Sequence, residues 1–365
     1  MNVCIIGDGL TSLSLAKNLI NKKINVHIYK KNKSKNIAVN RTIGIAKNNL
    51  EFFKKEIQSF SKENAWEIKK IEIYSEKLKD NKILQFENNN RNLFYMLKND
   101  ELYKLLNDKL LKSKFFKKTI IKKNNFYKKL LKENKYDLII NCESGNYIEK
   151  KFFFRKIDKN YYNIAYTAIL KHEKIINNIA TQVFTKFGPI AFLPISNTET
   201  SVVCSLENKN QEFSNKKVLD LIYKHNKKIM IEKISKLNSF KLKSSNLREY
   251  YHKNILAFGD QLHKIHPLAG QGFNMTIRDI KVLSKSIQNK IDLGLELDLL
   301  VCKEFENKTK HMNVIFSSGV DFIYEFFNFD KKTKNKSLSK ILKLFGKNKR
   351  LNKTIIKFAD SGLKI

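Results

Sequence analysis

The first thirty residues of the chain have the pattern of a strand, a glycine turn, a helix and a second strand. Residues 2–6 (NVCII) form an unbroken apolar run, and Gly7 and Gly9 follow directly. A helical pattern then covers about 10–22, and a second apolar run, INVHIY, occupies 24–29. Two short apolar strands joined by a helix run parallel and are buried on both faces of their sheet. This opening therefore predicts an α/β, Rossmann-like fold.

Glycine and proline are scarce, with 12 and 3 in 365 residues. All three prolines lie in two short segments, GPIAFLPI at 188–195 and GDQLHKIHPLAGQGFN at 259–274. These segments also contain Gly188, Gly259, Gly270 and Gly272. Because glycine and proline free or fix backbone dihedral angles, their clustering predicts backbone that is shaped to lie against a ligand.

The glycine turn GDGLTS has the features of a dinucleotide-binding turn. Gly7 allows a sharp exit from the strand, and Gly9 allows the backbone to approach a pyrophosphate at the N-terminus of the next helix. Ser12 stands where the usual pattern has a third glycine, and it is small enough to keep the helix close to the strand. The acidic residue expected at the end of the second strand is replaced by Lys30.

In the segment from 259, Asp260 is the last residue of the run NILAFGD at 254–260, which has the pattern of a buried strand followed by glycine. Its carboxylate can accept hydrogen bonds from a sugar or ribityl hydroxyl. Pro267, Gly270 and Gly272 predict a loop whose backbone N–H groups face a ligand, before a helix over about 275–290. A plain turn before a helix is the alternative. His263 and His266 have the spacing of a metal pair, but no third ligand is placed by the sequence, so no metal site is predicted.

The remaining pattern predicts two domains and a terminal segment. Strand-like, aromatic-rich runs between about 153 and 206 predict an antiparallel sheet, and helical patterns cover about 50–65, 99–113 and the last seventy residues. The predicted boundaries are 1–70, 95–152 and 246–300 for a discontinuous dinucleotide-type domain, 71–94 and 153–245 for a sheet-rich substrate domain, and 301–365 for a helical C-terminal segment.

The net charge of +36 comes from 71 basic and 35 acidic residues. The lysine excess runs evenly along the chain and accompanies no nucleic-acid-binding motif, so no nucleic-acid partner is predicted. Four cysteines lie far apart and predict reduced, mostly buried thiols: Cys4, Cys142, Cys204 and Cys302. The chain starts directly in a strand and has no apolar run of about 18 residues, so we expect a cytoplasmic protein without a signal peptide or a spanning helix.

Together these segments resemble the flavin-dependent aromatic hydroxylases, and more narrowly the ubiquinone-biosynthesis hydroxylases that act on polyprenylated phenols. GDGLTSLSLA resembles the family's FAD-binding glycine motif, and Arg41 in NRTIGIA matches its arginine near the flavin. GPIAFLPI resembles the GPxAxLP stretch of the ubiquinone branch. The second FAD motif is matched at Asp260, Pro267, Gly270, Gln271, Gly272, Asn274 and Asp279.

The resemblance implies a monooxygenase with non-covalent FAD, reduced by NAD(P)H, in which a flavin hydroperoxide formed with O2 hydroxylates an electron-rich phenol ring. It names no catalytic side chain. The implied cofactor-binding residues are Gly7, Gly9, Ser12, Arg41, Gly259, Asp260, Pro267, Gly270, Gln271, Gly272 and Asn274. Two departures from the family are Lys30 and the stretch NCESG at 141–145, which has Glu143 and Ser144 where the family has an Asp-Gly pair.

A polyprenylated substrate lies in a bilayer, which favours peripheral attachment to the inner face of an anionic membrane. Apolar residues at helical spacing in 312–327 and 338–345, with many lysines around the second segment, fit such a contact, and they fit packing on the core equally well. A ubiquinone-biosynthesis complex is a further expected partner. Three alternative functions stay open: a degenerate, non-catalytic homologue that supports such a complex, a related flavin oxidoreductase that acts on another lipid, and a nucleic-acid binder. The last is the weakest, because it rests on the charge alone.

Overall fold

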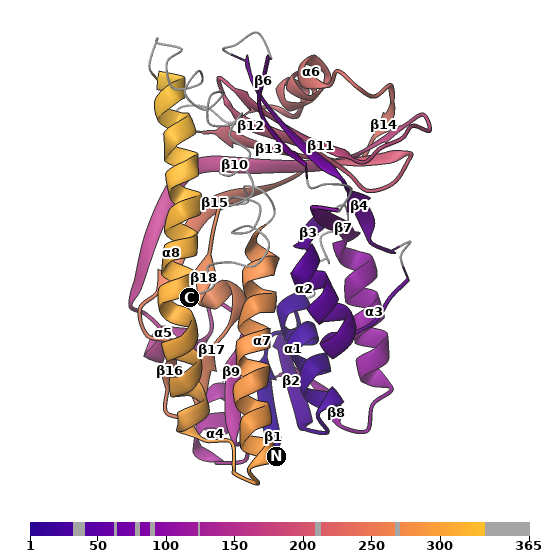
Figure 1. Cartoon of the computed structure of the whole chain (residues 1–365). Helices are drawn as coiled ribbons and strands as arrows, with labels where there is room; N and C mark the ends of the chain where they lie inside the picture. The colour runs from indigo at the N-terminus through magenta and orange to yellow at the C-terminus, as the bar shows by residue number, and fades with distance from the viewer. Residues whose placement is uncertain are drawn as a thin grey trace.

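A computed structural model describes residues 1–31, 41–61, 64–76, 81–87, 92–122, 125–208, 213–266 and 271–332 of the chain. Two sheets dominate it (Figure 1). One is mostly parallel and lies at the end of the molecule that holds the N-terminus, and the other is mostly antiparallel and crosses the opposite end.

The parallel sheet is built around β1. Its strands follow the order β16 (Tyr251–His252), β17 (Ile255–Ala257), β9 (Leu138–Asn141), β1 (Asn2–Ile6), β2 (Asn25–Lys31) and β8 (Phe116–Ile121). All neighbours are parallel except β16 and β17. Because parallel strands end at the same edge, the residues that follow β1, β2, β9 and β17 are brought together there.

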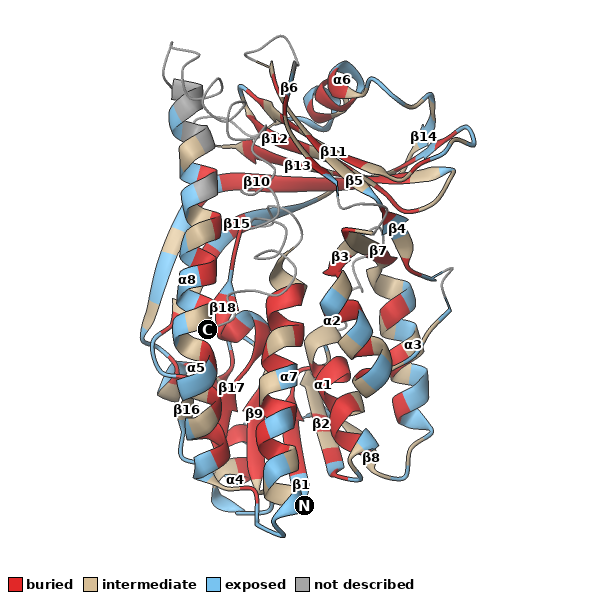
Figure 2. Cartoon of the chain, in the orientation of Figure 1, coloured by how far each residue is buried: buried red, intermediate tan, exposed pale blue. Residues whose placement is uncertain are grey.

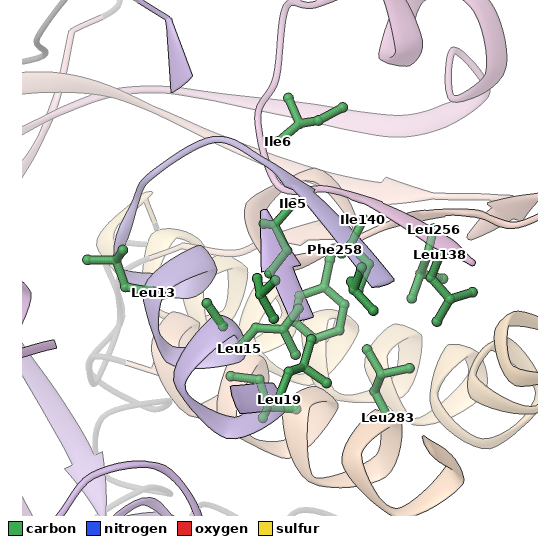
Figure 3. Packing of buried hydrophobic residues seen from close by; sticks show 14 of the residues in the cluster. Ile5, Ile6, Leu13, Leu15, Leu19, Leu138, Ile140, Leu256, Phe258 and Leu283 are labelled. Carbon is green, nitrogen blue, oxygen red and sulfur yellow. The ribbon is translucent and has the colours of Figure 1, made fainter. Parts of the chain in front are cut away.

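Helices cover this sheet and bury it. They are α1 (Leu10–Asn21), α3 (Asn99–Leu111), α4 (Phe126–Lys132), α5 (Tyr147–Phe152) and α7 (Gln271–Asp292). Figure 3 shows side chains of α1 and α7 packed on residues of β1, β9 and β17, among them Leu15, Leu283, Ile5, Ile140 and Leu256. In Figure 2 the central strands β1, β9 and β17 are almost entirely buried, whereas the helices are buried on one side only. This burial agrees with the continuous apolar strands and the amphipathic helices that the sequence predicts.

The antiparallel sheet is called the large sheet below. Its strands follow the order β18 (His263–Lys264), β15 (Asn238–Leu247), β10 (Lys156–His172), β13 (Glu199–Glu207), β12 (Gly188–Pro194), β11 (Ile179–Thr185), β5 (Lys70–Ser75) and β6 (Asn81–Glu87). Strand β14 (Ile231–Ile234) pairs with β10, and among the described strands of this sheet only β11 and β5 pair in parallel. Helix α6 (Asn215–His225) packs Val218, Leu221 and Ile222 on one face of the large sheet.

Smaller elements link the two sheets. A three-stranded sheet of β3 (Thr42–Ala46), β7 (Phe94–Lys98) and β4 (Trp66–Ile68) lies between them, and helix α2 (Lys47–Phe52) and a π-helical turn (Phe53–Ile57) follow β3. Met96 of β7 packs with Ala180 of β11.

Helix α8 (Leu299–Lys332) has 34 residues and runs along both layers (Figure 1). Phe305 packs with Phe258 near the parallel sheet, whereas Phe316 and Tyr324 pack with Tyr161 of the large sheet. Within the described residues, no helix is long and apolar enough to cross a lipid bilayer.

The predicted fold class is confirmed, and several details differ. The helix expected over 50–65 is shorter, because it ends at Ile57 and β4 begins at Trp66. The helix expected from about 275 begins at Gln271, so Gly272 belongs to its first turn and not to a loop. The apolar face expected in 312–327 is divided, since Phe316 is in the core while Ile315 is exposed. The segment 338–345 lies outside the described residues.

Candidate functional site

The glycine turn joins β1 to α1 at the carboxyl edge of the parallel sheet. Gly7 has φ +100°, and a Cβ added to it would lie 3.1 Å from the Cβ of Glu143. Both the dihedral angle and the close approach favour glycine there. At Gly9 no described atom lies within 4 Å of the place where a Cβ would be, so the backbone is open on this side.

The N-terminus of α1 can bind an anion. Its N-cap residue is Gly9, no side chain caps the helix in the described chain, and no acidic residue occupies its first turn. The first backbone N–H groups of a helix have no partner inside the helix, and they carry partial positive charge. Free N–H groups beside a residue that leaves the backbone open fit a pyrophosphate group.

The second segment meets this turn directly. Gly259 has φ +65°, and a Cβ added to it would lie 2.6 Å from Cγ2 of Thr11 in α1. It starts the 3-10 turn Gly259–Gln261 that follows β17, and Asp260 in this turn is exposed. The two glycine segments, some 250 residues apart in the chain, therefore come together at one edge of the sheet.

Several buried polar atoms around these segments have no hydrogen-bond partner among the described residues. They are both amide atoms of Gln261, Oε1 of Gln271 and Oε2 of Glu143. Buried polar atoms without a partner are costly, and at a ligand site they are places where a bound group or water completes the bonding. Gln261 was not among the residues expected from the sequence, because an amide inside a turn carries no signal of its own.

Charged side chains gather at the end of β2. Asp8 lies between Gly7 and Gly9, and its Oδ2 is 3.7 Å from Nζ of Lys30 and 3.3 Å from Nζ of Lys118. The hydroxyl of Tyr103 donates to the same oxygen at 3.2 Å. Burial, followed by the charge of Asp8, raises the pKa of Tyr103 to about 12, so this phenol stays a donor. Glu143 forms a separate ion pair with Lys31, with 3.3 Å between Oε1 and Nζ.

Asn274 attaches the first turn of α7 to β3 and α2. Its Oδ1 accepts from the backbone N–H of Ala46 and from Nδ2 of Asn49, both at 2.8 Å, and its Nδ2 donates to the carbonyl of Gly44 at 2.8 Å. The side chain is buried. In this structure Asn274 therefore positions the start of α7, on which Gln271 and Gly272 lie.

Arg41 is exposed and directly precedes β3. Its guanidinium carbon lies 5.6 Å from the ring centre of Phe240 in β15. One residue further on, Oγ1 of Thr42 donates to Oγ of Ser201 in β13 at 2.8 Å. The start of β3 thus lies against the large sheet, and Arg41 contacts β15 of that sheet.

The two histidines of the second segment have different partners. His263 contacts Asp279, with 2.5 Å between Nε2 and Oδ2, whereas His266 contacts Ser205, with 3.1 Å between Nε2 and Oγ. The ring of His266 also stacks on Tyr324, with ring centres 4.4 Å apart. Burial lowers the pKa of His266 to about 3, so it is neutral at physiological pH. Among the described residues no group of three possible ligands could hold a metal ion.

Pro267 and Gly270, which the resemblance places at the flavin, lie outside the described residues. Of the other expected residues, Gly7, Gly9 and Ser12 form the turn and the first turn of α1, and Gly259 and Asp260 lie against it. Ser12 is buried in α1, as expected of a small residue in place of a third glycine. Ser144 is exposed, directly after Glu143.

Comparison with protein families gives one model, described as squalene epoxidase, that matches residues 151–360. The mitochondrial ubiquinone biosynthesis monooxygenase COQ6 of Danio rerio is 27% identical over 213 residues, which cover 46% of this chain and 43% of that protein. The 3-demethoxyubiquinol 3-hydroxylase of Escherichia coli K12 is 29% identical over 153 residues, covering 40% of this chain and 39% of that protein. The matched stretches thus span less than half of these relatives. They confirm the resemblance to ubiquinone-biosynthesis hydroxylases.

Solved structures with the same fold cover nearly the whole chain. The p-nitrophenol 4-monooxygenase PnpA of Pseudomonas putida superposes with a TM-score of 0.76 at 11% identity, covering 100% of this chain and 98% of that one. The protein pqsL of Pseudomonas aeruginosa, described as a probable FAD-dependent monooxygenase, gives 0.71 at 11% identity, covering 94% and 99%. At this identity the likeness establishes the fold.

Proposed function

The chain belongs to the squalene epoxidase family, whose model matches more than half of it, and from this premise we propose that it is an FAD-dependent monooxygenase. We further propose that it hydroxylates the aromatic ring of a polyprenylated phenol in ubiquinone biosynthesis. The names of the similar proteins from Danio rerio and Escherichia coli support this substrate class.

The observation that carries the proposal is the meeting of the two glycine segments. Gly259 packs on Thr11, which brings Asp260 to the same edge as the uncapped N-terminus of α1. A dinucleotide needs such a pair of features, because it has a pyrophosphate at its centre and a hydroxylated chain next to it. The amide of Gln261 in the same turn, which has no hydrogen-bond partner among the described residues, fits a polar ligand as well.

The residues would hold FAD in the following way. The backbone at Gly7 and Gly9 and the start of α1 would bind the pyrophosphate, and the carboxylate of Asp260 would accept from the ribityl chain. The start of α7, fixed by Asn274, would face the flavin ring. When bound, the flavin supplies the activation of O2, and a phenol, O2, NAD(P)H and a proton would give the hydroxylated phenol, water and NAD(P)⁺.

The protein's own contribution is to orient the phenol and to exclude water. His266, Tyr161 and Tyr324 form a buried aromatic group where the second segment meets the large sheet and α8. A neutral histidine and buried rings at this place would keep the space beside the flavin dry without adding charge.

The substrate also requires access to a membrane. On α8 the exposed side chains of Ile315, Phe322 and Phe329 are seven residues apart, which places them on one face. We propose that this face contacts an anionic bilayer, with the basic residues of the chain giving electrostatic attraction.

The test uses purified full-length protein. We expect it to bind FAD, to oxidise NADH or NADPH in the presence of a short-tailed prenylphenol, and to add one atom from ¹⁸O₂ to the product. Bound FAD without hydroxylated product would favour a related flavin oxidoreductase. Failure to take up added FAD would favour a non-catalytic homologue and contradict the proposal.

A further inference from the structure

The end of β2 lacks the residue that dinucleotide folds use to hold the adenosine ribose. A carboxylate there accepts hydrogen bonds from ribose hydroxyls. β2 is parallel to β1, with Ile6 opposite Tyr29, so Lys30 stands one residue beyond the end of β1. A lysine ammonium has three donors and no acceptor, and it therefore replaces an acceptor with a donor.

A carboxylate is nevertheless present at this place, because Lys30 holds Asp8. Nζ of Lys30 lies 3.7 Å from Oδ2 of Asp8, and Lys118 of β8 and Tyr103 of α3 reach the same oxygen at 3.3 and 3.2 Å. All three partners bind Oδ2. Within the described chain, Oδ1 has neither a hydrogen bond nor an ion pair, and the side chain is about one-third exposed.

The second nearby carboxylate, Glu143, fits this role less well. Its Oε1 is paired with Lys31 and its Oε2 is buried, whereas the side chain of Asp8 is about one-third exposed. Its Cβ is pressed against Gly7 from the side of β9. Asp8 instead faces β2 and β8, on the side of β1 where the missing acid would lie.

We propose that Asp8 binds the adenosine ribose hydroxyls through Oδ1, and that Lys30, Lys118 and Tyr103 are positioning residues that fix it through Oδ2. The ribose-binding acid has thus moved from the end of β2 into the glycine turn. The ligand class is an adenine dinucleotide with free ribose hydroxyls. This inference rests on the proposed binding of FAD, and it assigns a group that the family pattern places elsewhere.

The experiment compares FAD with an analogue that carries 2′,3′-dideoxyadenosine, using flavin fluorescence to measure both dissociation constants with apoprotein. The wild type should bind FAD about tenfold or more tightly than the analogue, because a hydrogen bond to a charged group is lost. Asp8→Asn should bind the two ligands nearly equally. Glu143→Gln, the matched control, should keep the wild-type preference, and so should Glu51→Gln, which breaks only an exposed ion pair with Lys47.

A compensating variant keeps the test independent of folding defects. Lys30→Glu in the Asp8→Asn background returns a carboxylate to the end of β2 and should restore the preference for FAD. If the wild type prefers FAD and the Asp8→Asn variant keeps this preference, the inference about Asp8 is overturned and the proposed function is not. A wild type that binds neither ligand would overturn the proposed function as well.

Discussion

Nε2 of His263 lies 2.5 Å from Oδ2 of Asp279, and both side chains are almost completely buried. The other oxygen of Asp279 accepts from Nδ2 of Asn313 at 3.1 Å. These contacts join β18, α7 and α8. A residue of the second motif thus serves the packing of the site and not the ligand directly.

Asp279→Ala should destabilise the protein strongly. It leaves the buried groups of His263 and Asn313 without their acceptor, and breaking such a pair costs about 3–5 kcal/mol. Chemical denaturation of the full chain measures the change. His311→Ala, at an exposed position of α8, should alter the free energy of unfolding by less than about 0.5 kcal/mol. Equal stability of the two variants would show that the buried contact contributes nothing.

The substitution Gly259→Ala should lower the free energy of unfolding more than Gly294→Ala does. Both glycines have nearly the same positive φ, +65° and +67°. An alanine in that conformation lowers the free energy of unfolding by about 1–2 kcal/mol. At Gly294 no described atom lies within 4 Å of the added Cβ, whereas at Gly259 it meets Thr11 at 2.6 Å. The difference between the two unfolding free energies isolates the steric contact. Adding Thr11→Ala to the Gly259→Ala variant should restore part of the lost free energy of unfolding. If it restores none, the contact with Thr11 is relieved in another way.

Asp260→Ala should weaken FAD binding by about tenfold to a hundredfold, because a charge-assisted hydrogen bond to the ribityl chain is lost. The residue is exposed in the 3-10 turn, so the melting temperature of the apoprotein should stay close to that of the wild type. In contrast to Asp8→Asn, this variant should weaken FAD and the dideoxy analogue equally. Unchanged flavin affinity would place the cofactor elsewhere.

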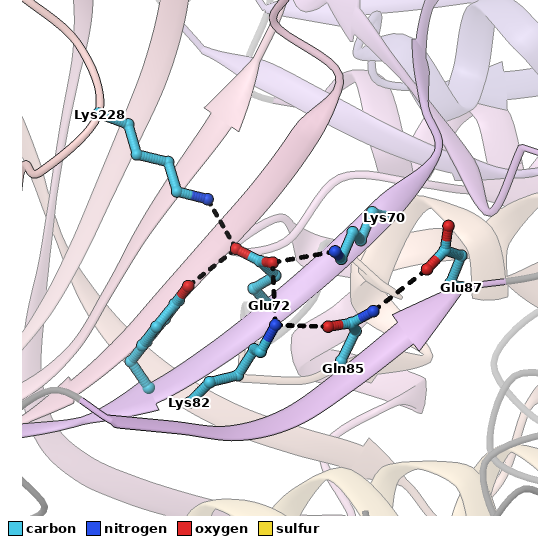
Figure 4. Close-up of polar contacts among 7 residues, drawn as sticks. Lys70, Glu72, Lys82, Gln85, Glu87 and Lys228 are labelled. Carbon is cyan, nitrogen blue, oxygen red and sulfur yellow. Dashed lines mark hydrogen bonds and ion pairs between the residues drawn. The ribbon is translucent and has the colours of Figure 1, made fainter.

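Glu72 is the centre of an ion-pair network on the large sheet (Figure 4). Its carboxylate is 2.6 Å from Lys228, 3.2 Å from Lys70 and 3.4 Å from Lys82, and it accepts from the hydroxyl of Tyr74 at 2.8 Å. Burial alone would raise the pKa of Glu72, but the bonds from Lys228, Tyr74 and Lys70 outweigh it and lower the pKa to about 2.

Glu72→Gln should therefore destabilise the protein by about 1–3 kcal/mol at neutral pH, since three ammonium groups lose their counter-charge. The folded pKa lies below the ordinary value of 4.5, so the contribution is complete above about 4.5 and is lost as the pH falls towards 2. Unfolding midpoints of wild type and variant should converge over that range. Glu232→Gln, at an exposed position of β14, is the control. If the difference between the unfolding midpoints of wild type and Glu72→Gln stays constant with pH, the charge of Glu72 is not its cause.

The parts of the fold that depend on local pattern could be predicted from the sequence. The unit β1–α1–β2 follows from apolar runs and a glycine turn, and its bounds differ from the prediction by one or two residues. The helix expected over 50–65 is present only as far as Ile57, and the chain then leads to β4, whose place is set by pairing with the distant strand β7.

The site was predictable as a set of segments and not as a set of contacts. The two glycine motifs can be recognised locally, whereas Asn274 binds residues 44, 46 and 49, and Asp8 binds side chains at positions 30, 103 and 118. The order of strands in the sheet determines which of these residues come into contact, and a single sequence does not specify that order. For the same reason Lys30 could be recognised as a departure from the family, but its pairing with Asp8 could not.

The exposed face of α8 allows the proposed membrane contact to be tested. Ile315, Phe322 and Phe329 are 46%, 68% and 61% exposed, while Phe316 and Tyr324 on the opposite side are buried. Three large apolar side chains on one face of a helix gain free energy by entering the interface of a bilayer, about 1.5–3 kcal/mol for each one fully buried.

Replacing Ile315, Phe322 and Phe329 together with glutamine should lower binding to vesicles of phosphatidylglycerol and phosphatidylcholine by at least about tenfold. Co-sedimentation of the full chain measures this at low and at high salt. High salt should weaken the wild type and the variant alike, because it screens the basic residues and leaves the apolar contribution. The control replaces Ile176, Tyr223 and Met230, which are 88%, 55% and 70% exposed on loops and α6 of the large sheet, and it should bind as the wild type does. If the α8 variant binds as well as this control at both salt concentrations, the contact lies on another surface, and charge alone would explain the attraction.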